Sequence, residues 1–187
     1  MNKWELPIKT EWMKSQMKHE PSRKYSEEIF NLVKKNPYEN ALEVGAAWGL
    51  STLAILLAGE GNLTSVDKDD PKYGGIKAPE EVKVNELEHR WKFILEDSRN
   101  FWEKNEDKIG TYDLIYIDGS HIYEDVYNDL CQGWRYLKKG GLLLLDDFTH
   151  KNNKTGMYGV SLAAWLLVAE QRITEVRTTP RILYFRK

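Results

Sequence analysis

The chain has 187 residues, which suits one domain with a full hydrophobic core and leaves little for a second. Its formal net charge of -2 gives no electrostatic basis for binding nucleic acid or an anionic membrane surface. No apolar run approaches the ~20 residues of a membrane-spanning helix, and the N-terminus lacks the apolar core of a signal sequence. With a single cysteine, Cys131, no intramolecular disulfide can form, so a cytoplasmic location is expected.

Short apolar runs alternate with amphipathic segments from residue 41 to the end of the chain. In chain order, the pattern predicts a strand at 41–44, a helix at 50–57, a strand at 63–66, a helix at 80–90, a strand at 92–95, a helix at 99–109 that Ser98 caps, a strand at 112–117, a helix at 123–137 that Gly140-Gly141 ends, a strand at 142–145, a helix at 161–170, and strands at 173–176 and 182–185.

This repeated alternation is typical of an α/β fold, a doubly wound, Rossmann-like and mostly parallel sheet. The last two strands are joined across Pro180 by a link too short for a parallel crossover, so they should form an antiparallel hairpin at the sheet edge. Residues 1–24 are polar and are interpreted as an N-terminal extension or lid, and residues 25–187 as the folded domain. A partner subunit could supplement the extension, which leaves a homo-oligomer open.

Carboxylates follow two of the strongly apolar strands. Asp118 begins the stretch Asp118-Gly-Ser-His121 after the strand at 112–117, and the pair Asp146-Asp147 follows the strand at 142–145. Ligands bind outside the carboxyl ends of the strands in open parallel sheets, so these side chains should meet at one edge. Three hard oxygen ligands favour Mg²⁺, Mn²⁺ or Ca²⁺ over zinc. We therefore predict that Asp118, Asp146 and Asp147 hold a divalent cation, with a solvated strand end as the competing interpretation.

A turn with two glycines joins the first strand to its helix. Gly45 and Gly49 allow a ligand to approach the backbone closely, but the three-glycine dinucleotide fingerprint is absent. Asp67 ends the second strand, 22 positions after Gly45, where an acidic side chain meets ribose hydroxyls in nucleotide-binding sheets. This combination indicates a nucleoside with little phosphate, and S-adenosylmethionine fits that description better than NAD.

The third strand ends on the same edge at Asp97 and Ser98, where one side chain could meet an adenine amino group, while helix capping explains Ser98 equally well. The residues predicted to contact the cofactor are Glu43, Gly45, Ala46, Ser51, Asp67, Lys68, Asp97, Ser98 and Asp118. The polar loops at 69–75 and 151–159 border the expected site, and such loops often set specificity.

Over residues 25–187 the chain resembles class I S-adenosylmethionine-dependent methyltransferases, through Glu43-Val-Gly45 to Gly49-Leu-Ser51 and through Asp67. The stretch Asp118 to Glu124 and the stretch Gly140 to Asp147 are similar to the metal-dependent small-molecule O-methyltransferases, in particular those of macrolide sugars and the cephalosporin-hydroxylase group. Catechol-type enzymes commonly have Asp-Asn where this chain has Asp146-Asp147, and the difference favours the sugar-type branch.

The resemblance implies an O-methyltransferase that uses S-adenosylmethionine and Mg²⁺ to methylate a hydroxyl of a small molecule. His121, three residues beyond Asp118, is placed to accept the hydroxyl proton, although it could instead only bind a neighbouring carboxylate. Two other classes compete with this hypothesis. One is a binding module that keeps the nucleoside pocket without turnover, and the other is an NAD-dependent oxidoreductase, which the missing third glycine disfavours.

Overall fold

The structure is a computed structural model that describes residues 9–69, 75–149 and 158–187. Most of the polar loops at 69–75 and 151–159 therefore lies outside the described residues. The elements, in chain order, are α1 (Glu11–Lys18), α2 (Glu20–Lys34), β1 (Asn40–Val44), α3 (Leu50–Ala58), β2 (Asn62–Asp67), α4 (Ala78–Val84), the 3₁₀ helix η2 (Glu88–Arg90), β3 (Trp91–Leu95), α5 (Ser98–Lys104), the 3₁₀ helix η3 (Glu106–Lys108), β4 (Tyr112–Ile117), α6 (Tyr123–Tyr136), β5 (Leu137–Leu145), α7 (Gly159–Glu170), β6 (Val176–Thr178) and β7 (Leu183–Arg186).

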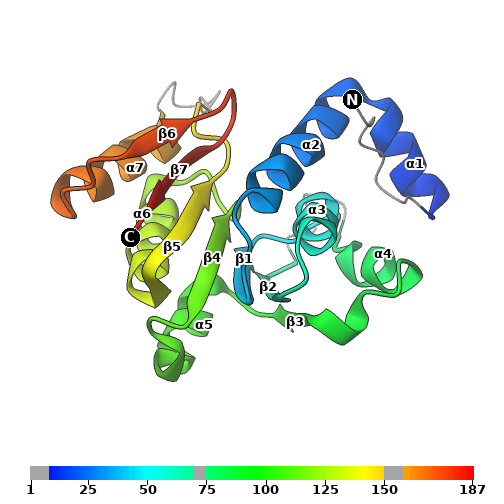
Figure 1. Cartoon of the computed structure of the whole chain (residues 1–187), viewed down its shortest axis with the longest axis horizontal. Coiled ribbons are helices and arrows are strands. Elements are labelled where there is room, and N and C mark those ends of the chain that lie inside the picture. Colours follow the sequence, from blue (N-terminus) through cyan, green and yellow to red (C-terminus); the bar gives the residue numbers. More distant parts are fainter. Residues whose placement is uncertain (1–8, 70–74, 150–157) are drawn as a thin grey trace.

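The strands form one seven-stranded sheet in the order β3-β2-β1-β4-β5-β7-β6 (Figure 1). The five strands from β3 to β5 are parallel, and the order reverses between β1 and β4. The predicted doubly wound, mostly parallel fold is therefore confirmed. The closing hairpin is confirmed too, but the antiparallel strand β7 pairs with β5 inside the sheet, and β6 forms the edge.

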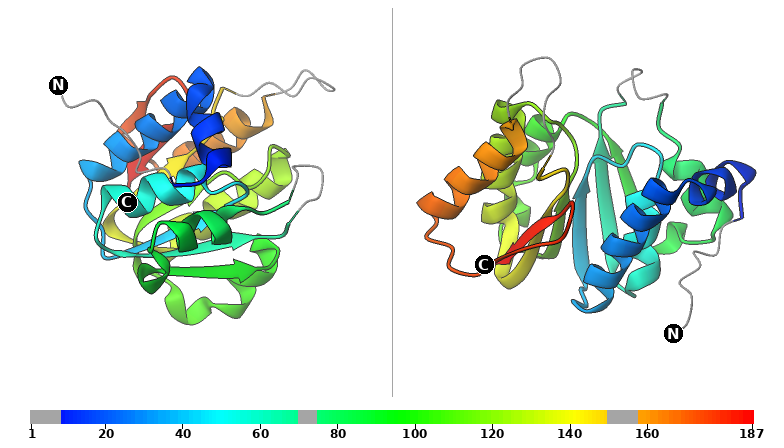
Figure 2. Two further views of the ribbon diagram at one scale, coloured as in Figure 1. Left: turned by 90° about the vertical axis from the view of Figure 1, so that its right-hand side faces the viewer. Right: turned by 90° about the horizontal axis from the view of Figure 1, so that it is seen from above.

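Helices cover both faces of the sheet, with α2, α3 and α4 on one side and α5, α6 and α7 on the other (Figures 1 and 2). Successive residues of β4 point to opposite faces, so Leu114 and Tyr116 pack in the cluster with α2 and α3. Ile115 and Ile117 pack in the cluster with α6 and α7. Because both faces are buried, the central strands are continuously apolar, which is why the sequence pattern located them.

The N-terminal helices pack on the domain. Helix α2 buries Tyr25, Ile29 and Val33 in the cluster that it shares with α3. The boundary expected at residue 24 falls inside α2, and the division into an extension and a domain stays a prediction.

Two predicted helices are shorter in the structure. Helix α4 ends at Val84, because Glu86 takes a left-handed backbone conformation with φ 62°. Helix α5 ends at Lys104 and begins one residue early, because Asp97 rather than Ser98 is its N-cap. The Asp97 carboxylate accepts the backbone N–H of Arg99 at 3.0 Å.

The pair Gly140-Gly141 does not end α6, as the sequence pattern suggested. The helix ends at Tyr136, and the two glycines lie within β5, where Gly140 has φ 81°. Among the described helices, none combines the length and the apolar character needed to span a membrane. The cytoplasmic location stays a prediction.

Glu43 is a carboxylate buried in the middle of the sheet, on β1. Its side chain is fully buried, and its Oε2 accepts the hydroxyls of Thr52 at 2.7 Å and Ser65 at 2.5 Å. Its Oε1 finds no hydrogen-bond partner among the described residues. Burial, which disfavours the charged form, raises the pKa of Glu43 to about 7, although the neighbouring hydroxyls act in the opposite direction.

Replacing Glu43 by Gln should flatten the pH dependence of stability. As the pH rises from the ordinary pKa of 4.5 to about 7, the unfolded chain releases this proton while the folded chain keeps it. The wild-type protein should therefore lose up to about 3 kcal/mol of unfolding free energy from this group, and Glu43→Gln should not. Urea unfolding at pH 5 and pH 8 measures the difference between the two proteins. A difference that stays the same at both pH values would contradict the assignment.

Candidate functional site

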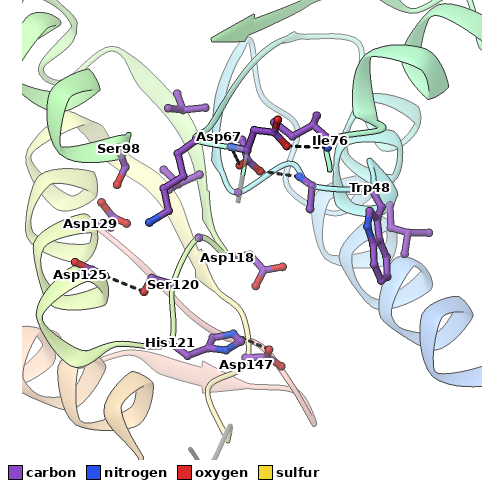
Figure 3. A pocket seen from close by; sticks show the side chains of 18 of the residues that line it. Trp48, Asp67, Ile76, Ser98, Asp118, Ser120, His121, Asp125, Asp129 and Asp147 are labelled. Atoms are coloured by element: carbon purple, nitrogen blue, oxygen red, sulfur yellow. Dashed lines mark hydrogen bonds and ion pairs between the residues drawn. The ribbon is translucent and has the colours of Figure 1, made fainter. Parts of the chain in front are cut away.

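A cavity of about 950 Å³ opens at the carboxyl ends of β1, β2, β4 and β5. This is the edge on which the sequence placed its candidate residues, next to the point where the strand order reverses between β1 and β4. Its volume lies in the range of small-molecule and cofactor sites. In Figure 3, Asp118 lies near the middle of the cavity. His121 and Asp147 lie together at one end of it, and Ser98 and Asp129 lie on another wall.

The glycine turn borders the cavity and needs glycine for a steric reason. Gly45 has φ 92°, and a Cβ built there would lie 2.2 Å from the carbonyl oxygen of Asp118. Gly49 has φ 84°, and its Cβ would lie 2.9 Å from Cα of Ala78. The turn after β1 therefore packs so closely against the end of β4 that position 45 has no room for a side chain.

Asp67 fixes the same turn from β2. Its Oδ2 accepts the backbone N–H groups of Ala46 and Ala47, each at 2.8 Å, and its Oδ1 accepts that of Asp69 at 3.0 Å. The two residues on which the nucleoside prediction depended, Gly45 and Asp67, thus lie side by side on the cavity wall. Asp67 has a structural role that the sequence did not reveal, because the turn is held by its carboxylate.

The other predicted cofactor residues lie in three places: on the main cavity, on a smaller cavity beside it, and outside both. Lys68, Asp97 and Ser98 line the main cavity, and the Lys68 ammonium lies 4.0 Å from the Asp97 carboxylate. Ala46 and Ser51 line a smaller adjoining cavity of about 80 Å³, which Tyr25 and Asp118 also border. Glu43 does not reach either cavity, because its side chain is fully buried under the turn against Thr52 and Ser65.

Two carboxylates of α6 line the cavity and were missed by the sequence analysis. Asp129 is buried and accepts the indole N–H of Trp102 at 2.8 Å, and burial raises the pKa of Asp129 to about 6. Asp125 accepts the Ser120 hydroxyl at 3.0 Å and pairs with Arg99 at 2.7 Å. The two acids are four residues apart and so share one helix face, a spacing that could have revealed them.

The predicted trio of carboxylates is not the group that the structure brings together. Donor atoms of Asp118, His121 and Asp147 lie within 4.8 Å of one another, and His121 Nε2 is 3.0 Å from Asp147 Oδ2. Asp146 is buried instead against Arg181, whose Nε and Nη2 donate to its two oxygens at 3.1 Å each. Asp146 thus faces Arg181 rather than the group of Asp118, His121 and Asp147, and its role as a cation ligand stays a prediction.

Hydroxyls of two tyrosines connect the separated carboxylates. Tyr25 donates to Asp118 Oδ2 at 2.9 Å, Tyr116 donates to Asp146 Oδ2 at 2.8 Å, and the two hydroxyls are 2.9 Å apart. Burial, together with the charges of Asp146 and Asp147, raises the pKa of Asp118 well above its ordinary value.

Acidic side chains dominate the cavity walls. Among the described lining residues there are eight carboxyl groups, against three lysine or arginine side chains and two histidines. The acids are Asp67, Asp69, Glu96, Asp97, Asp118, Asp125, Asp129 and Asp147. A cavity walled by one sign of charge attracts ligands of the opposite sign and disfavours a pyrophosphate.

Solved structures of the same fold cover nearly the whole chain. The O-methyltransferase from Bacillus cereus in complex with SAH has a TM-score of 0.76 at 16% identity, covering 97% of this chain and 93% of that one. The O-methyltransferase TomG from Streptomyces achromogenes, involved in tomaymycin synthesis and bound to SAM, has a TM-score of 0.72 at 12% identity, covering 97% and 92%. The SAH-bound methyltransferase PaMTH1 from Podospora anserina has a TM-score of 0.70 at 20% identity, covering 94% and 84%.

Sequence comparison gives one short match and one family. The chain is 42% identical to protein R132 of Acanthamoeba polyphaga mimivirus over 36 residues, which span 19% of this chain and only 16% of that protein. The family model described as a methyltransferase domain matches residues 42–148, which include the glycine turn, Asp67, Asp118 and the Asp146-Asp147 pair. Because this match covers more than half of the sequence, the chain belongs to the methyltransferase domain family.

Proposed function

We propose that the protein transfers a methyl group from S-adenosylmethionine to a hydroxyl of a small molecule. The observation that carries the proposal is one cavity that joins the turn of Gly45 and Asp67 to the group of Asp118, His121 and Asp147. Membership of the methyltransferase domain family supports the methyl transfer. The fold shared with O-methyltransferases that are bound to SAM or SAH supports the choice of donor and of oxygen as the acceptor.

The charge of the cavity favours this donor over NAD. S-adenosylmethionine carries a positive sulfonium and a positive ammonium, which match the surplus of carboxylates on the walls. NAD carries a pyrophosphate, which needs a three-glycine turn that this chain lacks. In this proposal Asp67 binds the ribose, while Gly45, Ala46, Ser51, Lys68, Asp97, Ser98 and Asp118 form the remaining contacts. Glu43 supports the turn from beneath without touching the donor.

His121 is the proposed base that takes the proton of the acceptor hydroxyl. Methyl transfer is an in-line displacement at the sulfonium carbon, so the hydroxyl must lose its proton as the new bond forms. His121 lines the cavity, and the Asp147 carboxylate 3.0 Å from its Nε2 holds the ring in place. A neutral imidazole can accept a proton near pH 7, and a positioned base contributes roughly 10²–10⁴-fold to the rate.

A divalent cation such as Mg²⁺ or Mn²⁺ fits the donor set beside His121. Donor atoms of Asp118, His121 and Asp147 lie within 4.8 Å of one another, and the two carboxylates supply the hard oxygen ligands that such an ion prefers. Asp118 and Asp147 would hold it, with His121 adjacent. When bound, it would lower the pKa of the acceptor hydroxyl and orient it.

Among hydroxylated acceptors we propose a sugar. The residues that line the cavity include His19, Ser22, His121, Asp147 and Arg181, which together offer both hydrogen-bond donors and acceptors. A sugar hydroxyl both donates and accepts a hydrogen bond, so this lining suits a neutral polyol.

The alternative to an enzyme is a module that binds the donor without turnover. Such a module would bind S-adenosylmethionine but would transfer no methyl group to any hydroxylated acceptor.

Donor binding should depend on Asp67. Asp67→Ala removes the charged acceptor of the ribose hydroxyls and the carboxylate that holds the turn, so donor binding should weaken by about 1–3 kcal/mol. Calorimetry with S-adenosylmethionine and with its demethylated product measures the change. Asp113→Asn is a control, because Asp113 binds the backbone of Glu39 and Asn40 away from the cavity. Unchanged donor affinity in Asp67→Ala would remove Asp67 from the site.

Methyl transfer should need a divalent cation held by Asp118 and Asp147. Chelator should abolish transfer from labelled donor, and Mg²⁺ or Mn²⁺ should restore it. Asp147→Asn should raise the concentration of cation that is needed, with donor affinity nearly unchanged, because the turn of Gly45 and Asp67 carries that binding. Full turnover in excess chelator would show that the cation has no part in the reaction.

His121 has two roles open to it, and one pair of variants separates them. As the base it must be neutral, so the rate should fall at acidic pH, and both His121→Ala and His121→Gln should lower turnover by roughly 10²–10⁴-fold. Gln keeps a hydrogen-bonding side chain of similar reach but cannot take the proton. If His121→Gln retains most of the turnover with the same pH profile, then His121 only orders its loop.

A further inference from the structure

Arg181 is a positively charged side chain that contacts both Asp146 and Asp147. It belongs to the connection between β6 and β7, and its guanidinium bonds Asp146 through Nε and Nη2 at 3.1 Å each. The same Nη2 lies 2.7 Å from Asp147 Oδ1. One guanidinium therefore serves both acids of the pair that follows β5, and it also lines the cavity.

The position of Arg181 is fixed from several sides. Its guanidinium carbon lies 4.5 Å from the centre of the Tyr25 ring on α2, a cation–π arrangement. Its backbone carbonyl accepts the N–H of Phe148 at 3.0 Å. The neighbouring Thr179 hydroxyl donates to Glu28, also on α2. Arg181 is thus built into the site, rather than a long surface side chain that happens to approach it.

The contacts of Arg181 bear directly on the proposed cation. Asp146 is buried and both of its oxygens already accept from the guanidinium, so it is not available as a ligand. Asp147 is shared, since Oδ1 faces Arg181 while Oδ2 faces His121 in the group with Asp118. A cation bound at that group would share a carboxylate with a fixed positive charge, and the two would repel each other.

We propose that Arg181 is a resident cation that sets the divalent-cation affinity of the site by withholding Asp146 and sharing Asp147. The proposal rests on the proposed function for the identity of the site. It makes Arg181 a positioning residue and makes the affinity for the divalent ion weaker than three free carboxylates would give. It also explains why the proposed ligands are Asp118 and Asp147, although three aspartates follow the two strands.

The test is a titration with Mn²⁺ alone, followed by calorimetry and by the electron paramagnetic resonance of free Mn²⁺, without donor or acceptor. Arg181→Gln should bind Mn²⁺ at least tenfold more tightly than the wild-type protein, because it removes a positive charge and releases Asp146. Arg177→Gln is the matched control, since Arg177 is exposed on β6 and lies 4.0 Å from Glu175, and its affinity should equal that of the wild type.

A second comparison covers the case in which Arg181→Gln does not fold, because it leaves the buried Asp146 without its partner. The double variant Asp146→Asn/Arg181→Gln is uncharged at both positions, and it should bind Mn²⁺ at least tenfold more tightly than Asp146→Asn alone. This pair isolates the charge of Arg181. Equal or weaker Mn²⁺ binding after removal of Arg181, or no binding by any variant, overturns the proposal. Binding of S-adenosylmethionine, measured on the same proteins, tests the proposed function separately.

Discussion

The backbone contact between Gly45 and Asp118 is the constraint on which the site depends. A Cβ at Gly45 would lie 2.2 Å from the Asp118 carbonyl oxygen, so the turn after β1 and the end of β4 can meet only at glycine. These two strands are neighbours because the sheet order reverses between them. The turn of Gly45 and Asp67 and the group of Asp118, His121 and Asp147 therefore line one cavity.

Three acids of the site, one buried and two half-buried, have different partners. Asp118 accepts the hydroxyl of Tyr25, which lies 2.9 Å from that of Tyr116, and burial raises the pKa of Asp118. Asp146 is neutralised by Arg181, whose guanidinium is positioned by two bonds to it. Asp147 lies between Arg181 and His121. A carboxylate that is removed from water needs a proton, a cation or hydrogen-bond donors, and the tyrosine hydroxyl, Arg181 and His121 stand beside these three acids.

The N-terminal helices are part of the site and not only a cover over it. Tyr25 of α2 donates to Asp118, and its ring lies against Arg181. Trp12 of α1 packs edge-on against Trp48, which lines the cavity, with ring centres 5.8 Å apart. A change in the packing of these helices would therefore move hydrogen bonds at Asp118, which links an element outside the parallel sheet to the chemistry at its edge.

The sequence by itself determined the order of strands and helices from β1 onward, although not α1 and α2, and it predicted the edge of the sheet that carries the site and the paired positions of Gly45 and Asp67. These follow from local rules, because apolar runs, glycine turns and strand ends act over a few residues. The tertiary structure decided which acids meet. Asp146 and Asp147 are adjacent in sequence and share Arg181, but of the two only Asp147 pairs with His121. Arg181 lies 35 residues from Asp146 in the sequence, and Tyr25 lies 93 residues from its hydrogen-bond partner Asp118. Contacts made over such separations depend on how the layers pack, and a pattern in a single chain does not contain that information.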